Sequence, residues 1–430
     1  MTDPSVSSPP SVRSPKIVQG VSFAVFRDRV MRNWIERHGR VFEINVPFFG
    51  RSVVVSDPTL VKAVYAASPR QLINVQPNLS NWFGPGSVFG LDGDRHRDRR
   101  RVLASSFHGQ NRTAHERIVE EETLSESASW PEGQEFPILE PMSRITLNVI
   151  LRTIFGADAD SGDLRGLREI VPPLMSLGQV VAFAPAPPRL IRRHTPWRRL
   201  DGLRLAFDRI VMTLIARAEV DRDLAERTDV LATLVRSGIS RQDVCDEVLT
   251  LIAAGHETTA SALGWVFERL RRHPRVLAEL VDEVAKGGKD FRRATIMESL
   301  RVRTVIDVAG RRVRAQDFDL GQWKIPRDRT VLVRIADLHD NRDVFAAPER
   351  FDPHRFNGET PAAKAWLAFG GGAHRCLGAE FAVAEMDVVL RTVLQNFRIQ
   401  TDAAADERSH FRGIAHTPKL GGRVVVNRRT

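Results

Sequence analysis

Apolar residues near the start of the chain follow two different spacings. Phe23–His38 has the spacing of a helix, whereas Arg40–Asn45 and Arg51–Val55 alternate or run apolar on either side of a turn at 47–50. Pro58–Ala67 returns to helical spacing. The pattern therefore predicts a helix, two strands joined by a turn, and a second helix.

The stretch Gln71–Gly93 has no such periodicity. Glycines and a proline are interleaved there with Trp82, Phe83, Val88 and Phe89, which is typical of a loop. An apolar loop of this kind is suited to lining a pocket.

Helical spacing then dominates the chain to about residue 300. Ser240 has the character of an N-cap with Asp243 at the third helical position, and no proline interrupts the pattern before His273. These signals predict one helix of about 30 residues.

The last third of the chain changes to short pieces rich in β-forming residues. Thr330–Ile335 reads as a strand, Phe345–Phe356 as a meander studded with prolines, and a glycine-rich loop follows. Leu377–Asn396 is predicted to form a final long helix.

The composition is that of an ordinary globular protein. Of 430 residues, 42% are hydrophobic and 27% charged, which excludes a chain that is disordered throughout. Residues 1–20 are rich in serine and proline without apolar periodicity, so we expect a flexible arm there. Residues 21–430 are predicted to form a single domain, because no repeat or linker divides them.

Cysteine count and charge narrow the functional classes. Cys245 and Cys376 are too few for a disulfide scaffold or a CxxC zinc site, which indicates a reducing compartment. We expect a cytoplasmic protein without a transmembrane anchor, since there is neither an apolar run of membrane length nor a signal peptide. The net charge of +10 leaves nucleic acid or an anionic membrane open as partners.

The strongest local signal is a cysteine between a glycine-rich loop and the last predicted helix. The sequence reads Phe369-Gly370-Gly371-Gly372-Ala373-His374-Arg375-Cys376-Leu377-Gly378. A helix N-terminus and basic neighbours favour the thiolate, while glycines let the backbone approach a flat macrocycle and direct N–H groups at the sulfur. An isolated cysteine is more often a buried structural residue, but the ten-residue pattern favours a haem ligand.

The pattern F-x-x-G-x-x-x-C-x-G, formed by Phe369, Gly372, Cys376 and Gly378, resembles the haem-thiolate loop of the cytochrome P450 family. Other landmarks follow in the family's order from about residue 40 to 430. The resemblance implies a mainly α-helical fold with small β-sheets, a triangular prism with a long central helix over the haem. It also implies haem b (iron protoporphyrin IX) with Cys376 as the axial iron ligand, in a soluble bacterial type of the family.

A second landmark lies in the long predicted helix. Ala254-Gly255-His256-Glu257-Thr258 resembles the family's oxygen-activating A-G-x-[DE]-T segment. Glycine costs a helix about 1 kcal/mol relative to alanine, and the small Ala254 and Gly255 would leave space for a diatomic above iron. The Thr258 hydroxyl can bond to a carbonyl one turn back, and Glu257 can relay protons. The competing interpretation is a helix with a tolerated glycine; a zinc-protease H-E-x-x-H helix is excluded because alanine replaces the second histidine.

A third landmark pairs Glu298 with Arg301, three residues later on a helix. Such pairs usually contribute only about 0.2–0.5 kcal/mol at a surface. Together with Pro348-Glu349-Arg350-Phe351, however, they resemble the family's E-x-x-R and P-E-R-F arrangement. The resemblance implies that Glu298, Arg301 and Arg350 form a network that holds the meander under the cysteine loop, with Arg355 as the competing partner.

The two haem propionates implied by the resemblance need basic partners, because burying unpaired carboxylates is costly. His96 and Arg100 form an H-x-x-x-R pair on one helical turn and resemble the family's early propionate clamp. Arg311 and His374 occupy the other corresponding positions. The neutral interpretation of Arg95, Arg97, Arg99, Arg100 and Arg101 is a solvated basic face, and only Arg100 has the required spacing.

The chain departs from the family's pattern at three places that hold no ligand position. No proline pair follows Arg301, and the connection from Glu283 to Glu298 is short. The segment Pro326-Arg327-Asp328-Arg329 lacks the usual turn glycine. These departures bear on the shape of the substrate pocket rather than on haem binding.

The resemblance implies a monooxygenase that inserts one atom of O2 into a hydrophobic small molecule. Electrons are expected from a separate ferredoxin and its reductase, since no flavin or iron–sulfur segment follows the cysteine loop, and no nucleic acid is expected as partner. The alternatives are a haem-thiolate peroxygenase or isomerase, or a basic non-enzymatic protein that binds nucleic acid. Peripheral membrane contact through the basic and apolar region 184–199 also stays open.

Overall fold

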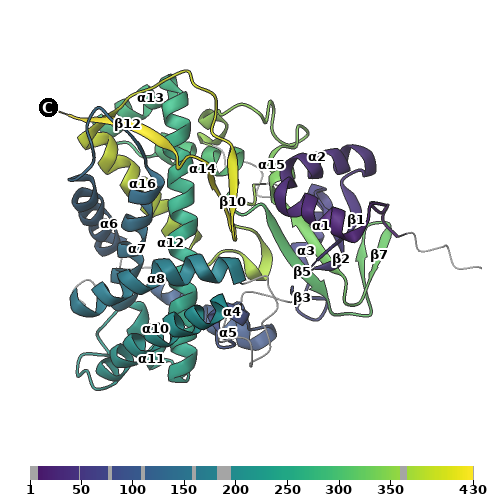
Figure 1. Cartoon of the computed structure of the whole chain (residues 1–430), viewed down its shortest axis with the longest axis horizontal. Helices are drawn as coiled ribbons and strands as arrows, with labels where there is room; N and C mark the ends of the chain where they lie inside the picture. The colour runs from purple at the N-terminus through teal and green to yellow at the C-terminus, as the bar shows by residue number, and fades with distance from the viewer. Residues whose placement is uncertain are drawn as a thin grey trace, which may run out of the picture.

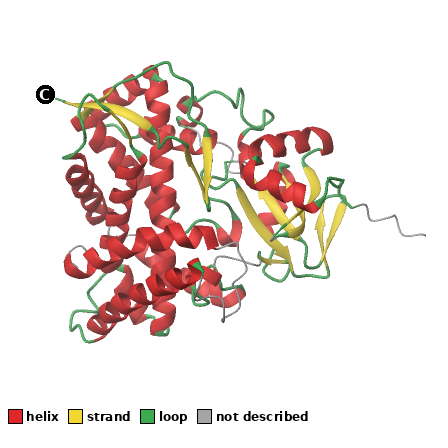
Figure 2. Ribbon diagram, in the orientation of Figure 1, coloured by secondary structure: helices red, strands yellow, loops and turns green. Residues whose placement is uncertain are grey.

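The computed structural model describes residues 8–47, 49–75, 80–107, 112–156, 161–181, 195–358 and 366–429. Helices form one large part of the molecule, whereas many of the strands lie together at one side with the N-terminal helices (Figure 2). The predicted fold class, mainly α-helical with small β-sheets, is confirmed. None of the helices in the described ranges is both long enough and apolar enough to cross a membrane.

A five-stranded sheet and two helices form that side of the molecule. They are β1 (Val41–Val46), β2 (Gly50–Val55), β3 (Leu72–Asn74), β5 (Val308–Val313), β8 (Thr330–Arg334), α2 (Arg27–His38) and α3 (Pro58–Ala66). The strand order is β1-β2-β8-β5-β3, and only β2 and β8 pair in parallel. Because successive side chains point to opposite faces, Val53 and Val55 pack with α3 while Val54 packs with α2.

The N-terminal segment is more ordered than the sequence predicted. A helix, α1 (Lys16–Val25), begins inside the expected arm and is separated from α2 by Phe26. The amide of Gln19 donates to the carbonyls of Val12 and Ser14 and accepts from the backbone N–H of Asn45. These bonds tie the segment to β1, so the prediction of a flexible arm at 1–20 was wrong for 16–20.

The long predicted helix is α12 (Arg241–Arg272), which runs through the middle of the helical part (Figure 1). The Ser240 hydroxyl accepts a hydrogen bond from the backbone N–H of Asp243 at 3.1 Å, which confirms the predicted N-cap. The surrounding helices are α5 (Gly93–Phe107), α6 (Arg112–Ser127), α7 (Leu139–Phe155), α8 (Ser161–Val181), α10 (Pro196–Glu219), α11 (Val230–Arg236), α13 (Pro274–Ala285), α14 (Asp290–Val302) and α16 (Ala379–Asn396).

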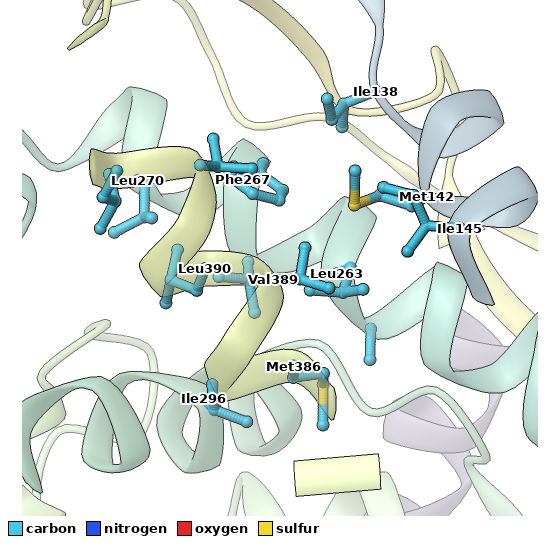
Figure 3. Close-up of a cluster of buried hydrophobic side chains, with 14 of the residues drawn as sticks. Ile138, Met142, Ile145, Leu263, Phe267, Leu270, Ile296, Met386, Val389 and Leu390 are labelled. Atoms are coloured by element: carbon cyan, nitrogen blue, oxygen red, sulfur yellow. The ribbon is translucent and has the colours of Figure 1, made fainter. Parts of the chain in front are cut away.

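The largest hydrophobic core lies where α7, α12, α14 and α16 meet (Figure 3). Met142, Leu263, Ile296, Val389 and Leu390 are among its buried side chains. Each such side chain stabilises the fold by about 1.5–3 kcal/mol relative to an exposed position. This core fixes α16 against α12, so it positions the loop that immediately precedes α16.

Three smaller sheets and several short elements complete the fold. They are β4 (Glu135–Pro137), β6 (Asp317–Leu320), β7 (Trp323–Pro326), β9 (Phe397–Ile399), β10 (Ser409–Arg412), β11 (Ala415–Pro418), β12 (Arg423–Arg428), α4 (Ser80–Phe83), α15 (Ile335–His339), η1 (Pro353–Phe356) and η2 (Gly372–His374). The stretch predicted as loop, Gln71–Gly93, thus contains β3 and α4. At the turn that lacks glycine, Asp328 itself adopts a left-handed conformation with φ +68°, which aspartate tolerates better than most residues.

Candidate functional site

The cysteine loop, residues Phe369–Gly378, presents Cys376 just before α16 begins. Gly370 and Gly372 have φ values of +66° and +65°, a conformation that favours glycine. A side chain at Gly372 would also collide with the carbonyl oxygen of Tyr65. The backbone N–H of Cys376 donates to the carbonyl of Phe369 at 2.9 Å, and Gly378 is the N-cap residue of α16. The glycines therefore fold the loop tightly on α3 and hold the thiol at a helix N-terminus.

The two cysteines have opposite surroundings. Cys245 is buried on α12, and burial raises the pKa of its thiol to about 12, so it stays protonated. Cys376 is exposed to solvent, yet enough protein surrounds it that burial raises its pKa, while the Gly378 N–H and the charges of Arg100 and Arg375 lower it. Burial thus opposes the thiolate form that the helix N-terminus and the basic neighbours favour.

Four basic residues that lie far apart in the sequence meet beside the cysteine loop. We call His96, Arg100, Arg311 and His374 the basic cluster; they come from α5, β5 and η2. The rings of His96 and His374 are 4.2 Å apart between centroids, and Arg100 Nη2 donates to the carbonyl of Arg375 at 2.9 Å. The structure brings together all four residues that the resemblance implied.

Among the described residues, the carboxylate of Asp92 interacts electrostatically with the basic cluster, through Arg311. None of the cluster's four side chains, however, forms an ion pair with a carboxylate of the described residues. Burial, and then the charges of neighbouring arginines, lower the pKa of His96 to about 4 and of His374 to about 3. Burial also lowers the pKa of Arg100 and of Arg311. A buried anion would compensate this concentration of donors, so the cluster fits the two carboxylates of a haem.

The remaining arginines of α5 behave as the neutral interpretation expected, with one exception. Arg95, Arg97 and Arg101 are exposed, and Arg97 and Arg101 pair with aspartates three residues before them. Arg99 is instead buried, and its guanidinium donates to Glu247 on α12 at 2.9 Å. Arg99 is therefore part of the protein interior rather than of a solvated face.

The segment Ala254–Thr258 lies at the middle of α12. Ala254, Gly255, Glu257 and Thr258 are half-buried, whereas the flanking residues of this central helix are almost all buried. Partial exposure on a helix surrounded by other helices indicates an internal space. Thr258 Oγ1 donates to the carbonyl of Ala254 at 2.6 Å, which is the predicted bond to the preceding turn.

Two other contacts, both made by His256, hold this segment against α7. The hydroxyl of Ser143 lies 2.8 Å from His256 Nε2, and Thr146 Oγ1 donates to the carbonyl of His256 at 3.1 Å. A Cβ at Gly255 would lie 3.2 Å from Ile150 Cδ1. The glycine therefore allows α7 to pack closely on α12, and the prediction of space for a diatomic now depends mainly on Ala254.

The predicted network around Glu298 has a different second arginine. Arg301 donates to both carboxylate oxygens of Glu298 at 2.7 and 2.8 Å, and both side chains are fully buried. The second guanidinium is that of Arg355, whose Nε lies 3.1 Å from Glu298 Oε1. Arg350 is exposed and contributes only its backbone carbonyl, which accepts from Arg301 at 3.0 Å. The prediction that the Arg350 guanidinium joins the pair was wrong.

Sequence reasoning also missed how the loop 84–90 is held. The backbone N–H groups of Gly86 and Val88 donate to Asp246 and Glu247 of α12, each at 2.9 Å. Arg204 of α10 donates to the carbonyl of Phe83 at 2.9 Å and pairs with Asp246. The two acids, which are buried, thus fasten an apolar loop to the N-terminal half of α12. These contacts left no signal in the sequence, because all of the partners lie far away along the chain.

The region predicted to touch a membrane, residues 184–199, lies mostly outside the described part of the chain. Residues 182–194 lie outside the described part of the chain, and Pro196–Arg199 form the first turn of α10. The prediction of peripheral membrane contact is therefore untested by the fold.

Comparisons with known proteins agree with the geometry. The family model described as "Cytochrome P450" matches residues 16–422. A Mycobacterium tuberculosis protein named "Putative cytochrome P450 138" is 52% identical over 432 residues, covering 99% of this chain and 98% of its own length. Another from the same species, "Putative cytochrome P450 135B1", is 36% identical, covering 98% of this chain and 92% of its own. The solved structure "Retinoic acid bound cyanobacterial CYP120A1" has a TM-score of 0.84 at 20% identity, covering 99% of this chain and all of that one.

Proposed function

Because this chain belongs to the cytochrome P450 family, whose members are haem-thiolate monooxygenases, we propose that Cys376 ligates the haem iron. The substrate is a hydrophobic small molecule that receives one atom of O2, while the other atom is reduced to water. The observation that carries this proposal is the exposed Cys376 thiol beside a basic cluster whose four side chains form no ion pair with a carboxylate of the described residues.

Residues from α5, β5 and the cysteine loop would hold the cofactor. Cys376 supplies the sulfur, and Phe369, Gly372 and Gly378 shape the loop around it. His96, Arg100, Arg311 and His374 bind the two carboxylates, because two cations and two neutral imidazoles offer many donors to two anions. When bound, the haem supplies reductive activation of O2 under the electron donation of a thiolate.

The Ala254–Thr258 segment would manage protons on the other side of the cofactor. Thr258 Oγ1 donates its own proton to the Ala254 carbonyl at 2.6 Å, so its lone pairs stay available to accept from a water molecule. Such a water is held where protons are consumed when O2 is reduced. Glu257 precedes Thr258 and is half-buried, so it can pass protons between the interior and solvent.

The apolar character of the substrate is supported by the residues near this segment. Trp82 and Phe83 are buried, and their rings stack with centroids 4.4 Å apart. Phe89 lies 5.8 Å from the Phe83 ring. Because α4 packs on α12 and the loop 84–90 is fastened to it, these apolar rings are held against the helix that carries Ala254–Thr258. Apolar walls with few polar groups are typical of small-molecule sites.

A separate electron donor is required by the family's reaction, and we infer an acidic ferredoxin supplied by a reductase. The chain carries a net charge of +10. Arg375 is exposed next to Cys376, and Arg95 is exposed on α5 close to the basic cluster. A positive surface near the cysteine loop attracts an acidic partner and speeds its association.

The experiment that tests the proposed function is turnover with heavy-isotope-labelled O2. The haem-loaded protein is combined with a ferredoxin, its reductase and a reductant, and hydrophobic compounds are first screened for shifts in haem spin state. A compound that binds is expected to gain one labelled oxygen atom. Conversion that proceeds without O2, or only with peroxide, would instead favour an isomerase or a peroxygenase.

A further inference from the structure

The helix α1 presents an apolar face to solvent. Half of the large apolar side chains that are exposed in the described residues lie within 17–26. They are Ile17, Val18, Val21, Val25 and Phe26. Their exposed fractions range from 50% to 75%. Exposed apolar side chains are ordinary when they occur singly, whereas a contiguous group marks a surface for a partner or a membrane.

The fold uses only the opposite face of α1. On that face Gln19, Gly20 and Phe23 are buried, and the helix packs there on β1 and α2 (Figure 1). Phe23 belongs to the hydrophobic cluster between the sheet and α2, and a Cβ at Gly20 would collide with the ring of Pro47. The exposed apolar residues of the helix are spaced three, four and seven positions apart, so they lie together on the outward side.

Basic residues flank this outward face, and no acidic residue interrupts it. From residue 8 to residue 27 the chain contains no aspartate or glutamate. Arg13 and Lys16 precede the apolar residues, Arg29 follows them, and all three are exposed. Within the described ranges, none of the three pairs with a carboxylate. An apolar helix face with basic residues at its ends is the pattern of helices that lie in the interface of an anionic bilayer.

We propose that α1 docks on the surface of a bilayer that contains anionic lipids, with its apolar face toward the acyl chains and Arg13, Lys16 and Arg29 at the headgroups. The competing occupant is a second copy of the chain. A stable dimer interface takes about 20–30 residues from each partner, whereas this face has five large side chains on and directly after a helix of 10 residues. The inference goes beyond the proposed function and needs neither haem nor turnover.

The first test measures co-sedimentation of the full chain with vesicles, either of phosphatidylcholine alone or of an equal mixture with phosphatidylglycerol. Wild-type protein is expected to bind the mixed vesicles. Val21→Ser combined with Val25→Ser should lower the partition coefficient by at least about tenfold. Both positions are exposed, and serine and valine have similar helix propensities, so the fold is kept. Val220→Ser with Leu420→Ser is the matched control, because it removes two exposed apolar side chains elsewhere in the fold.

The basic residues are tested separately. Arg13→Gln with Lys16→Gln should weaken binding to the mixed vesicles by about tenfold and leave binding to phosphatidylcholine unchanged. Added salt should weaken wild-type binding to the mixed vesicles in the same direction. Equal binding by the wild type and by the variant with both Val21→Ser and Val25→Ser would overturn the proposal. Absence of wild-type binding to the mixed vesicles would overturn it as well.

Hydrogen–deuterium exchange of the wild-type protein covers the case in which a variant fails to fold. Addition of mixed vesicles is expected to slow amide exchange in peptides that contain residues 16–26. Slower exchange confined to another segment, such as 184–199, would overturn the assignment of α1.

Sedimentation without lipid tests the competing occupant, and a monomer is expected. A dimer that dissociates on Val21→Ser with Val25→Ser would assign the apolar face to a second copy of the chain and would also overturn the proposal.

Discussion

The hydroxyl of Thr258 is held by a single bond of 2.6 Å to the carbonyl of Ala254. That bond fixes the direction of the oxygen atom and leaves its lone pairs toward the half-buried side of α12. The geometry suits a residue that holds a water molecule for proton delivery. A role in packing alone, which a valine could fill, fits this position less well, because Ala254, Gly255 and Glu257 around it are only half-buried.

Thr258→Ala is therefore expected to uncouple reductant consumption from product formation. General acid–base groups typically contribute about 100-fold or more, and we expect the product formed per reductant consumed to fall by at least about tenfold. Thr258→Ser keeps the hydroxyl and should retain most of the coupling. The measurement compares product with consumed reductant and released peroxide. Full coupling in the alanine variant would contradict the role assigned to Thr258.

Glu385 shows the effect of burial on a carboxyl group. It lies on α16, is almost completely buried, and its Oε1 makes no hydrogen bond to the described residues. Burial raises its pKa well above the usual value. The cavity beside it is lined by the charged or titratable groups of His115, Glu116, Lys289, Asp290, Arg293, Glu380 and Asp387.

This shift predicts how stability depends on pH. Above the ordinary carboxyl pKa of about 4.5, the unfolded chain loses a proton that folded Glu385 keeps, so the free energy of unfolding falls as pH rises. Glu385→Gln should remove this slope and be more stable than wild type at pH 8, with a smaller difference at pH 5. Denaturant unfolding at both pH values measures this. Glu380→Gln, at an exposed position of the same helix, is the control; equal slopes for wild type and Glu385→Gln would contradict the assignment.

At the scale of elements, one buried carboxylate connects α14 to the meander that precedes the cysteine loop. Glu298 accepts from Arg301, Arg355 and the backbone N–H of Asp352. Trp366 Nε1 also donates to the carbonyl of Met297 at 3.1 Å. The chain on both sides of the unplaced residues 359–365 is thus fixed to the same helix. Through these contacts α14 supports the start of the cysteine loop.

The two arginines of the meander should respond very differently to substitution. Arg355→Leu leaves buried Glu298 with one cation fewer and should cost about 3–5 kcal/mol of stability and weaken haem retention, as removal of one partner of a buried ion pair does. Arg350→Leu keeps the backbone carbonyl that Arg301 uses and should change stability by no more than about 0.5 kcal/mol. Unfolding followed by circular dichroism and by haem absorbance tests this. Similar losses for both variants would contradict the assignment of Arg355.

At the scale of the whole molecule, local signals predicted the elements and a family pattern predicted the site. Some features depend only on neighbouring residues, so the sequence alone identifies them. They are the N-cap at Ser240, the paired strands β1 and β2, and the helix that follows Cys376. Contacts between side chains that lie far apart in the sequence were harder to predict. Spacing could not choose between Arg350 and Arg355, because both lie in the same meander and only the folded chain shows which side chain faces Glu298.

Two further features were beyond sequence reasoning for the same physical reason. Residues 16–20 lack a helical pattern of their own, and they are ordered by the bonds of Gln19 to β1 and the preceding segment. Tyr65 is separated from Cys376 by about 300 positions and belongs to no motif. Only the folded chain shows that α3 lies against the cysteine loop, where a Cβ at Gly371 would be 3.0 Å from two carbons of the Tyr65 ring.

The central claim is that Cys376 ligates the haem iron and that the fold positions this cysteine to do so. The most direct measurement is the absorption spectrum of the reduced protein with carbon monoxide, for the wild type and for Cys376→Ser, with Cys245→Ser as the matched control. We predict the red-shifted Soret band of thiolate ligation for the wild type and for Cys245→Ser, and its loss in Cys376→Ser. The same red-shifted band in Cys376→Ser, or its absence from the wild-type protein loaded with haem, would contradict this account.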